Sequence, residues 1–285
     1  KRINATWKQP IFLIGFPRSG TTLLDTILRT HSKINVIEEK PMLEKVRSFF
    51  SNTLDVSLVE KIDNKKAEKA SKIYFNELKN YLDEESDNLL IDKLPLNILY
   101  LPLINQIFPK ARYILAIRHP LDCVLSCWMQ NFKLNEAMVN MCDLNQTSDF
   151  YSTSMEIFNL SKKRYNLNIH IIRYEDLVIN FKQEITNLLS FLNLQWEDNL
   201  INYQKTALTR DIIFTPSYSQ VLKPIYKSFK GWKSSTVGIK NFDELPENAK
   251  NYIKALEKFI ETKISSISTS PERNDTILIQ DPFNL

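Results

Sequence analysis

A loop that could bind an anion lies near the start of the chain. Residues 15–22 read GFPRSGTT and stand between a short apolar run and a stretch with apolar residues at helical spacing. Two of the chain's four glycines, Gly15 and Gly20, are in this loop, where a backbone must turn tightly and approach a ligand closely. The helix start that follows would direct unpaired N–H groups at an anion, and Arg18 would add charge-assisted hydrogen bonds.

The residue types in this loop differ from those of a nucleotide triphosphatase. The spacing matches GxxxxGK[ST], but Thr21 stands where that motif needs lysine. ATP hydrolysis would lose its main charge partner, and a P-loop small-molecule kinase remains an alternative. An ordinary strand-to-helix turn that binds nothing is the simpler alternative, but the combination of glycines, hydroxyls and an arginine weighs against it.

A second basic site is expected further along the chain. Residues 111–118, ARYILAIR, predict a buried strand that ends in Arg118, and the following helix carries Asp122 and Ser126. An arginine at a strand's carboxyl end and a serine two turns into the next helix can converge on one phosphate. Alone, Arg118 would more often be a solvated strand end. Beside the first loop, it indicates a nucleotide anchored at two phosphates.

Several elements must position these residues. Strands are expected at 11–16, 34–39, 88–93, 111–118 and 168–174, with helices between most of them. This alternation indicates an α/β, P-loop-like three-layer fold with a mostly parallel central sheet and helices on both faces. Ligands in such folds gather at the carboxyl ends of the strands. We expect one domain, 1–285, with a helical insertion at about 42–84 and an irregular tail at about 199–285 that covers the cofactor and acceptor.

Composition excludes some classes of protein. The chain has 37 Lys and Arg against 33 Asp and Glu, which is too balanced for a nucleic-acid binder. Cys123 and Cys127, two of three cysteines, are four apart on an expected helix, which favours core packing in a reduced compartment. The sequence has no 18-residue apolar run and no apolar signal peptide at its start, so no transmembrane segment is expected. We expect a cytoplasmic protein, or a Golgi-luminal one if it is eukaryotic and trimmed.

These motifs together resemble those of the sulfotransferase superfamily that uses 3′-phosphoadenosine 5′-phosphosulfate (PAPS). PRSGTT resembles the 5′-phosphosulfate motif, and RHPLD with Ser126 resembles the 3′-phosphate motif. The likeness is greatest to the tyrosylprotein sulfotransferases and to the bacterial sulfotransferases that carry tetratricopeptide repeats, and it runs from about Ile11 to Lys233. It implies transfer of a sulfuryl group from PAPS to a hydroxyl-bearing acceptor without a metal. A repeat domain could precede residue 1.

The resemblance also implies which residues bind the cofactor. The phosphosulfate would be surrounded by Pro17, Arg18, Ser19, Gly20, Thr21 and Thr22, and the 3′-phosphate would be bound by Arg118 and Ser126. Tyr174, in the family-like segment RYEDL, would lie near the cofactor, although a strand ending in a helix cap explains that segment equally well. A basic residue beside Trp232 would also contact it. That segment is one residue shorter than the family's pattern, which leaves Lys230 and Lys233 as alternatives.

The catalytic residues follow from the same resemblance. Glu39, 21 residues after Arg18, would be the general base that takes the acceptor's proton. Lys93 would contact the bridging oxygen and the sulfuryl group, and Ser217 would reach the same region. Glu38 is an alternative base. The three histidines, His31, His119 and His170, are further alternatives.

The acceptor is left open by the sequence. Lys40 and Pro41 follow Glu39, where the tyrosylprotein enzymes have Thr-Arg, so peptidyl tyrosine is not expected. A peptide, a saccharide, a lipid and a small metabolite all remain candidates, because acceptor pockets are built from variable loops. A non-catalytic nucleotide-binding module is the alternative from another class of protein.

Overall fold

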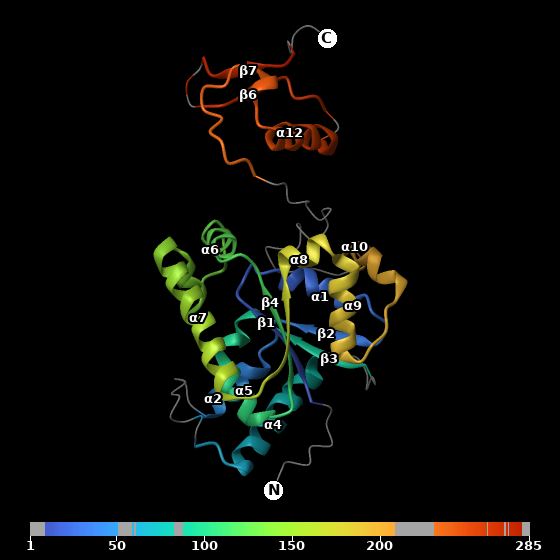
Figure 1. Ribbon diagram of the computed structural model, residues 1–285. Coiled ribbons are helices and arrows are strands. Elements are labelled where there is room, and N and C mark those ends of the chain that lie inside the picture. The colour runs from blue at the N-terminus through green and yellow to red at the C-terminus, as the bar shows by residue number, and fades with distance from the viewer. Residues whose placement is uncertain are drawn as a thin grey trace. The chain divides into compact units, whose positions relative to one another are not determined.

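The computed structural model describes residues 9–50, 59, 61–82, 88–208, 231–260, 262–270, 272 and 274–280 (Figure 1). The contacts within the chain divide it into two compact units, Lys1–Ile225 and Tyr226–Leu285. This division differs from the single domain expected over residues 1–285. Each unit is described by itself below.

The first unit is built on a five-stranded sheet. Its strands are β1 (Ile11–Gly15), β2 (Ile34–Glu38), β3 (Leu89–Lys93), β4 (Arg112–Ile117) and β5 (Asn168–Arg173). They lie in the order β2-β3-β1-β4-β5, and every neighbouring pair is parallel. All five therefore end at the same edge of the sheet. The expected strands are confirmed to within one or two residues at their ends.

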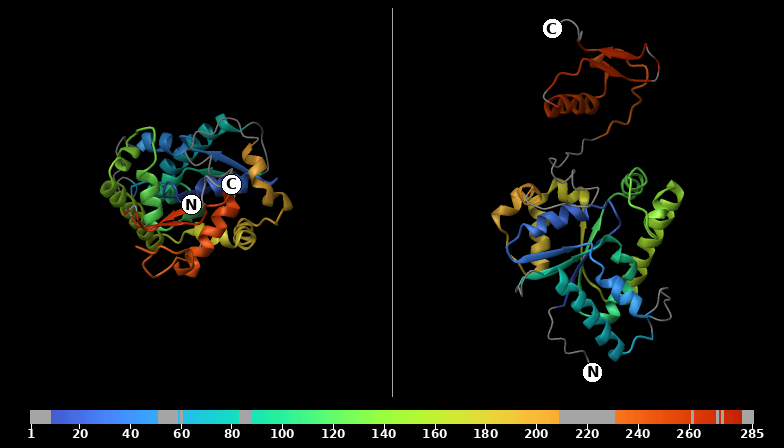
Figure 2. Two further views of the ribbon diagram at one scale, coloured as in Figure 1. Left: turned by 90° about the horizontal axis from the view of Figure 1, so that it is seen from above. Right: turned by 180° about the vertical axis from the view of Figure 1, so that it is seen from behind.

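Helices cover both faces of this sheet, as Figures 1 and 2 show. On one face lie α1 (Thr21–Arg29), α9 (Phe181–Leu192) and α10 (Tyr203–Leu208); on the other lie α2 (Met42–Phe50), α4 (Asn64–Leu78), α5 (Leu101–Ile107) and α7 (Leu144–Arg164). Strand β1 shows why both faces are needed. Ile11 and Leu13 join one apolar cluster, whereas Phe12 and Ile14 join the other.

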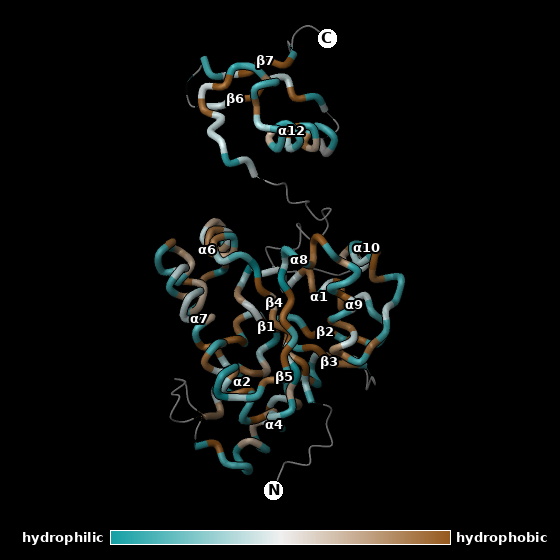
Figure 3. Tube along the Cα trace, viewed as in Figure 1, coloured by the Kyte–Doolittle hydropathy of each residue, from teal (hydrophilic) through white to brown (hydrophobic). Residues whose placement is uncertain are grey.

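The α/β three-layer fold is thus confirmed, and the sheet forms the hydrophobic centre of the first unit (Figure 3). The helices expected in 42–84 are present as α2 and α4, and they contribute Met42, Val46 and Tyr74 to the core. Two more helices, α6 (Pro120–Trp128) and α8 (Tyr174–Ile179), follow β4 and β5 directly at the carboxyl edge. Cys123 and Cys127 are buried free thiols on α6, as the four-residue spacing predicts.

The second unit has its own small core. Helix α12 (Glu247–Ile260) and the antiparallel strands β6 (Ser266–Ser268) and β7 (Thr276–Leu278) surround a cluster of Leu245, Ala249, Ile253 and Ile277. An irregular tail was expected here, whereas the structure has a helix and two strands of three residues each. The spacing of Leu245, Ala249 and Ile253 is helical and could have predicted the helix. Among the described residues of the chain, no helix meets the length and hydrophobicity that a membrane span requires.

Candidate active site

The loop after β1 has the backbone that its glycines predict. Gly20 precedes α1 with φ of 99°, a left-handed conformation, and a Cβ there would lie 2.8 Å from Cδ2 of Tyr174. A Cβ at Gly15 would lie 2.6 Å from the carbonyl oxygen of Ala116 on β4. Arg18 also has a positive φ, 68°, which is uncommon for a side chain of its size. The loop is therefore a tight turn that presses against β4 and α8.

Arg18 joins this loop to α6. Its Nε donates to the hydroxyl of Ser126 at 2.9 Å, and the side chain is 9% exposed. The thiol of Cys127 donates to the carbonyl oxygen of Pro17, the residue before Arg18. Helix α6 therefore contacts this loop at two adjacent residues. Burial, the largest influence, lowers the pKa of Arg18, and the neighbouring charge of Arg118 lowers it further, whereas Cys127 opposes the shift. Arg18, expected at the phosphosulfate, and Ser126, expected with Arg118 at the 3′-phosphate, are thus brought together.

Arg118 lies beside the same loop. Its guanidinium stacks on the ring of Tyr174 at 4.9 Å, a cation–π contact, and its Nη2 lies 3.6 Å from Asp122. Two donors at this place, the Nε of Arg118 and the Oγ of Ser19, are buried with no hydrogen-bond partner among the described residues. Because buried donors are nearly always paired, they mark a place where an anion would be bound.

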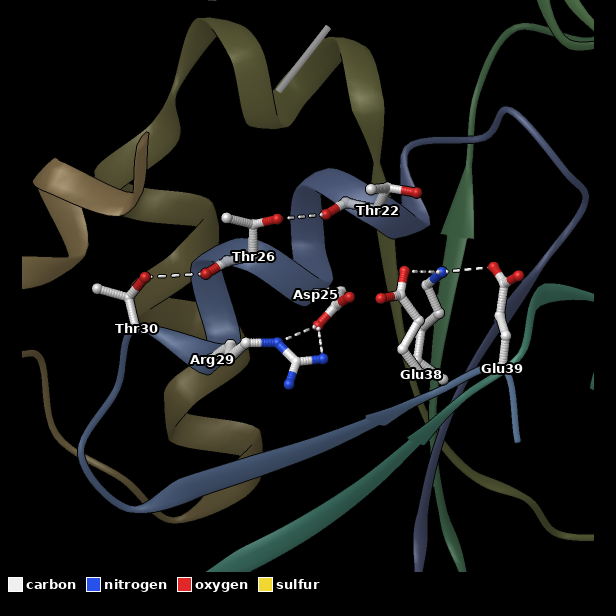
Figure 4. Close-up of polar contacts among 8 residues, drawn as sticks. Thr22, Asp25, Thr26, Arg29, Thr30, Glu38 and Glu39 are labelled. Carbon is white, nitrogen blue, oxygen red and sulfur yellow. Dashed lines mark hydrogen bonds and ion pairs between the residues drawn. The ribbon is translucent and has the colours of Figure 1, made fainter. Parts of the chain in front are cut away.

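A buried lysine lies at the same carboxyl edge of the sheet, at the end of β3, two strands from β4. Lys93 is the last residue of β3, is fully buried, and pairs in register with Leu13 of β1. Its Nζ donates to Oε1 of Glu38 at 3.0 Å and to Oε1 of Glu39 at 2.7 Å (Figure 4). Burial, the largest influence, lowers the pKa of Lys93, but the carboxylates of Glu39, Glu38 and Asp25 outweigh it and raise the pKa above its ordinary value.

Glu38 and Glu39 reach one ammonium because the backbone bends between them. In a strand, consecutive side chains point to opposite faces. Glu38 ends β2 in register with Lys93, whereas Glu39 has φ of 50° and donates its N–H to the carbonyl oxygen of Lys93 at 2.8 Å. This left-handed residue turns its side chain back to the same lysine. The Glu38 side chain is 17% exposed and that of Glu39 is 40% exposed, so Glu39 is the more accessible of the two.

Asp25 was not predicted from the sequence. It is fully buried on α1 and accepts two hydrogen bonds from Arg29, at 3.0 and 2.8 Å, and its charge helps to raise the pKa of Lys93. The sequence does contain a sign that Asp25 is unusual, since this charged residue interrupts the apolar helix face of Leu24, Ile27 and Leu28. A charged residue on a buried helix face is rarely tolerated without a partner.

The histidines do not assemble a second site. His31 is buried, where its Nε2 bonds to the carbonyl oxygen of Gln195 and its Nδ1 accepts from the backbone N–H of Lys33. His170 lies against the ring of Phe191, in the middle of β5. His119 precedes α6 and is exposed beside Arg118.

Four expected residues are not among the described residues of the first unit. Ser217 and Lys230 are outside the described residues. Trp232 and Lys233 belong to the second unit, where both are exposed. The loop residues Pro17 to Thr22, with Glu39, Lys93, Arg118, Ser126 and Tyr174, are all in the first unit at the carboxyl edge of its sheet.

Comparison with known proteins assigns the first unit. The model of the sulfotransferase family matches residues 10–198, so the chain belongs to that family. The chain is 31% identical to an uncharacterized protein of Aquifex aeolicus over 231 residues, which are 78% of this chain and 30% of that protein. A sulfotransferase domain from the Synechococcus PCC 7002 olefin synthase is 20% identical, with a TM-score of 0.49 over 77% of this chain and 86% of that one.

The rest of the chain is similar to another family. The adenylosuccinate synthetase model matches residues 200–277, and the synthetase of Psychrobacter sp. is 46% identical over 67 residues, which are 24% of this chain and 16% of that enzyme. The chain therefore matches less than a third of the length of either curated relative. Ser217, Lys230, Trp232 and Lys233 were assigned by likeness to sulfotransferases, but they lie in the segment that resembles the synthetase.

Proposed function

We propose that the chain transfers a sulfuryl group from PAPS to the hydroxyl of an acceptor, with Glu39 as general base. The observation that carries this proposal is the fully buried Lys93 ammonium, bonded to a half-exposed Glu39 at the sheet edge that also holds the anion loop. A cation and a base side by side are what attack by a hydroxyl on an anionic sulfuryl group requires.

The residues present fit PAPS. Arg18, Ser19, Gly20 and the start of α1 at Thr21 and Thr22 would hold the phosphosulfate, and Pro17 shapes the turn. Arg118 and Ser126 would hold the 3′-phosphate beside Tyr174. The unpaired buried donors of Ser19 and Arg118 support this assignment, since a phosphate or sulfate oxygen would satisfy both.

The chain's own residues account for each requirement of the transfer. PAPS, when bound, supplies an activated sulfuryl group and a phosphate leaving group. A carboxylate oxygen of Glu39 would take the proton of the acceptor hydroxyl. At the same time the hydroxyl oxygen would bond to sulfur, and the bond from sulfur to the leaving phosphate would break. Lys93 and Arg18 would stabilise the charge that grows on the sulfuryl oxygens and the leaving phosphate, and no metal is needed. The acceptor is a hydroxyl-bearing peptide, saccharide, lipid or metabolite.

Calorimetric binding of 3′-phosphoadenosine 5′-phosphate (PAP) tests the cofactor. We expect binding that is much tighter than that of 5′-AMP and that weakens at least tenfold in Arg118→Ala. Arg164→Ala is the matched control, because Arg164 also stacks on a tyrosine but ends α7, before the amino end of β5. Equal or tighter binding of ATP with magnesium would contradict the proposal and favour a kinase.

Turnover tests the general base. Transfer of the sulfuryl group from 4-nitrophenyl sulfate to PAP runs the reaction in reverse: a phosphate oxygen of PAP bonds to sulfur, the ester S–O bond breaks, and protonated Glu39 would return its proton to the leaving phenol oxygen, which gives a coloured product. We expect Glu39→Gln to bind PAP normally and to lose at least 100-fold in this rate. PAP binding in the wild type with no turnover, either of 4-nitrophenyl sulfate or of any hydroxyl acceptor supplied with PAPS, would favour a non-catalytic module.

A further inference from the structure

Lys93 needs more than one carboxylate. A fully buried ammonium loses its hydration, and an unpaired one in that place would carry a large free-energy penalty. Of the hydrogen bonds from Lys93 to the two glutamates, the one to Glu39 is the shorter, at 2.7 Å. If Glu39 takes a proton from an acceptor, its negative charge disappears, and its bond to Lys93 weakens. Another group must then keep the ammonium charged and in place.

Glu38 has the position to do this. It ends β2 in register with Lys93, so the sheet itself holds the two residues side by side. Its carboxylate bonds to the same Nζ at 3.0 Å, and it is less exposed than Glu39, at 17% against 40%. Glu38 is the last residue of β2, whereas Glu39 follows the strand with a left-handed backbone. The two adjacent glutamates therefore differ in accessibility although they share one partner.

Asp25 adds a third negative charge near Lys93, besides those of Glu38 and Glu39. Its carboxylate accepts two hydrogen bonds from Arg29 and is fully buried on α1, and it acts on Lys93 as a nearby negative charge. Figure 4 shows the two glutamates and Asp25 around the same place, with Asp25 on α1 and the glutamates at the end of β2. Asp25 is committed to Arg29, whereas Glu38 bonds directly to Lys93.

We propose that Glu38 is a positioning residue for sulfuryl transfer: it holds the buried Lys93 ammonium, so that Glu39 can leave that ammonium and accept the proton of the acceptor. This inference rests on the proposed function. It assigns different roles to two adjacent glutamates that the sequence alone does not distinguish.

The test compares Glu38→Gln with wild type and with Glu44→Gln, which removes an exposed carboxylate on α2. We expect Glu38→Gln to keep its affinity for PAP within about threefold and to lose ten- to 100-fold in kcat with 4-nitrophenyl sulfate. Its rate should also begin to fall at a lower alkaline pH than that of wild type, because Lys93 has lost one of the carboxylates that raise its pKa. Glu38→Asp should recover part of the rate, and Glu44→Gln should match wild type.

A readout without turnover separates this inference from the proposed function. NMR of ¹³C-labelled lysine side chains follows the protonation of Lys93, whose signal is identified by its loss in Lys93→Met. We expect its titration midpoint to fall in Glu38→Gln and to stay at the wild-type pH in Glu44→Gln. An unchanged midpoint, or an unchanged kcat and alkaline limb, would overturn the inference. Failure of wild type to bind PAP would overturn the proposed function instead.

Discussion

Nε of Arg18 donates to Oγ of Ser126 across 2.9 Å, although 108 residues separate them in the chain. This bond ties the anion loop after β1 to the helix after β4. In the proposed function these two residues serve different phosphates. The bond therefore connects the two ends of the proposed nucleotide site directly.

Substitution of Ser126 tests this connection. Ser126→Ala removes a hydroxyl that would bind the 3′-phosphate, and hydrogen bonds to charged groups contribute about 1.5–3 kcal/mol. We expect affinity for PAP to fall roughly tenfold or more, whereas affinity for 5′-AMP stays unchanged, as measured by calorimetry. Ser152→Ala, an exposed serine on α7, is the control. An equal loss for both nucleotides would mean that Ser126 acts only through Arg18.

Gly20 is expected to tolerate no side chain. Gly20→Ala would place a Cβ 2.8 Å from Tyr174 and force a left-handed backbone on alanine, at a cost of about 1–3 kcal/mol in unfolding free energy. Urea denaturation measures this difference. Gly231→Ala is the control, because a Cβ at Gly231 meets nothing within 4 Å. Equal stability of the two variants would contradict the turn described for residues 15–22.

Asp92 makes the stability of the first unit depend on pH. Burial raises the pKa of Asp92 to about 7, although a 2.8 Å hydrogen bond from Tyr74 opposes this. Between about pH 4 and 7 the unfolded chain loses this proton while the folded chain keeps it, so the unfolding free energy falls by a few kcal/mol and then levels off.

Asp92→Asn removes this titration and keeps an acceptor for Tyr74. We expect the variant to be more stable than wild type above pH 7 and to show a flatter dependence of urea midpoint on pH. Asp149→Asn, on the exposed side of α7, should leave that dependence unchanged. A wild-type pH dependence in Asp92→Asn would refute the assignment.

The two units should unfold separately, because each has its own buried cluster. We expect two calorimetric transitions, of which PAP raises only that of the first unit, by mass action. Leu245→Ala should destabilise the second unit by about 2–5 kcal/mol and leave the first transition in place. A single transition that Leu245→Ala lowers as a whole would show that the units unfold together.

The sequence predicts the site wherever a short motif coincides with a strand end. The loop at 15–22 and Arg118 lie at one edge of the sheet, as expected, because parallel strands end there and the residues that follow them converge. The bend at Glu39 was not predictable, since no glycine or asparagine marks its positive φ. The distinction between Glu38 and Glu39 depends on that bend. Asp25 was missed because its partner Arg29, four residues on along the same helix, makes the two resemble a surface ion pair, although Asp25 is buried.

The second unit was missed for a different reason. Likeness to a short basic segment beside Trp232 extended the sulfotransferase interpretation past residue 198, where the family match ends. Three-residue strands carry almost no periodic signal, so only the spacing of Leu245, Ala249 and Ile253 could have indicated a separate core.

The order of the strands has a practical consequence for altering this protein. Strand β1 lies in the middle of the sheet, with the glutamates and Lys93 on β2 and β3 to one side and Arg118 and Tyr174 after β4 and β5 to the other. The residues proposed to bind the 3′-phosphate and those proposed to act on the acceptor thus lie on opposite sides of β1. In the proposed function, substitutions in the residues directly after Glu39, such as Lys40 and Pro41, are therefore expected to change the choice of acceptor more than the binding of the nucleotide.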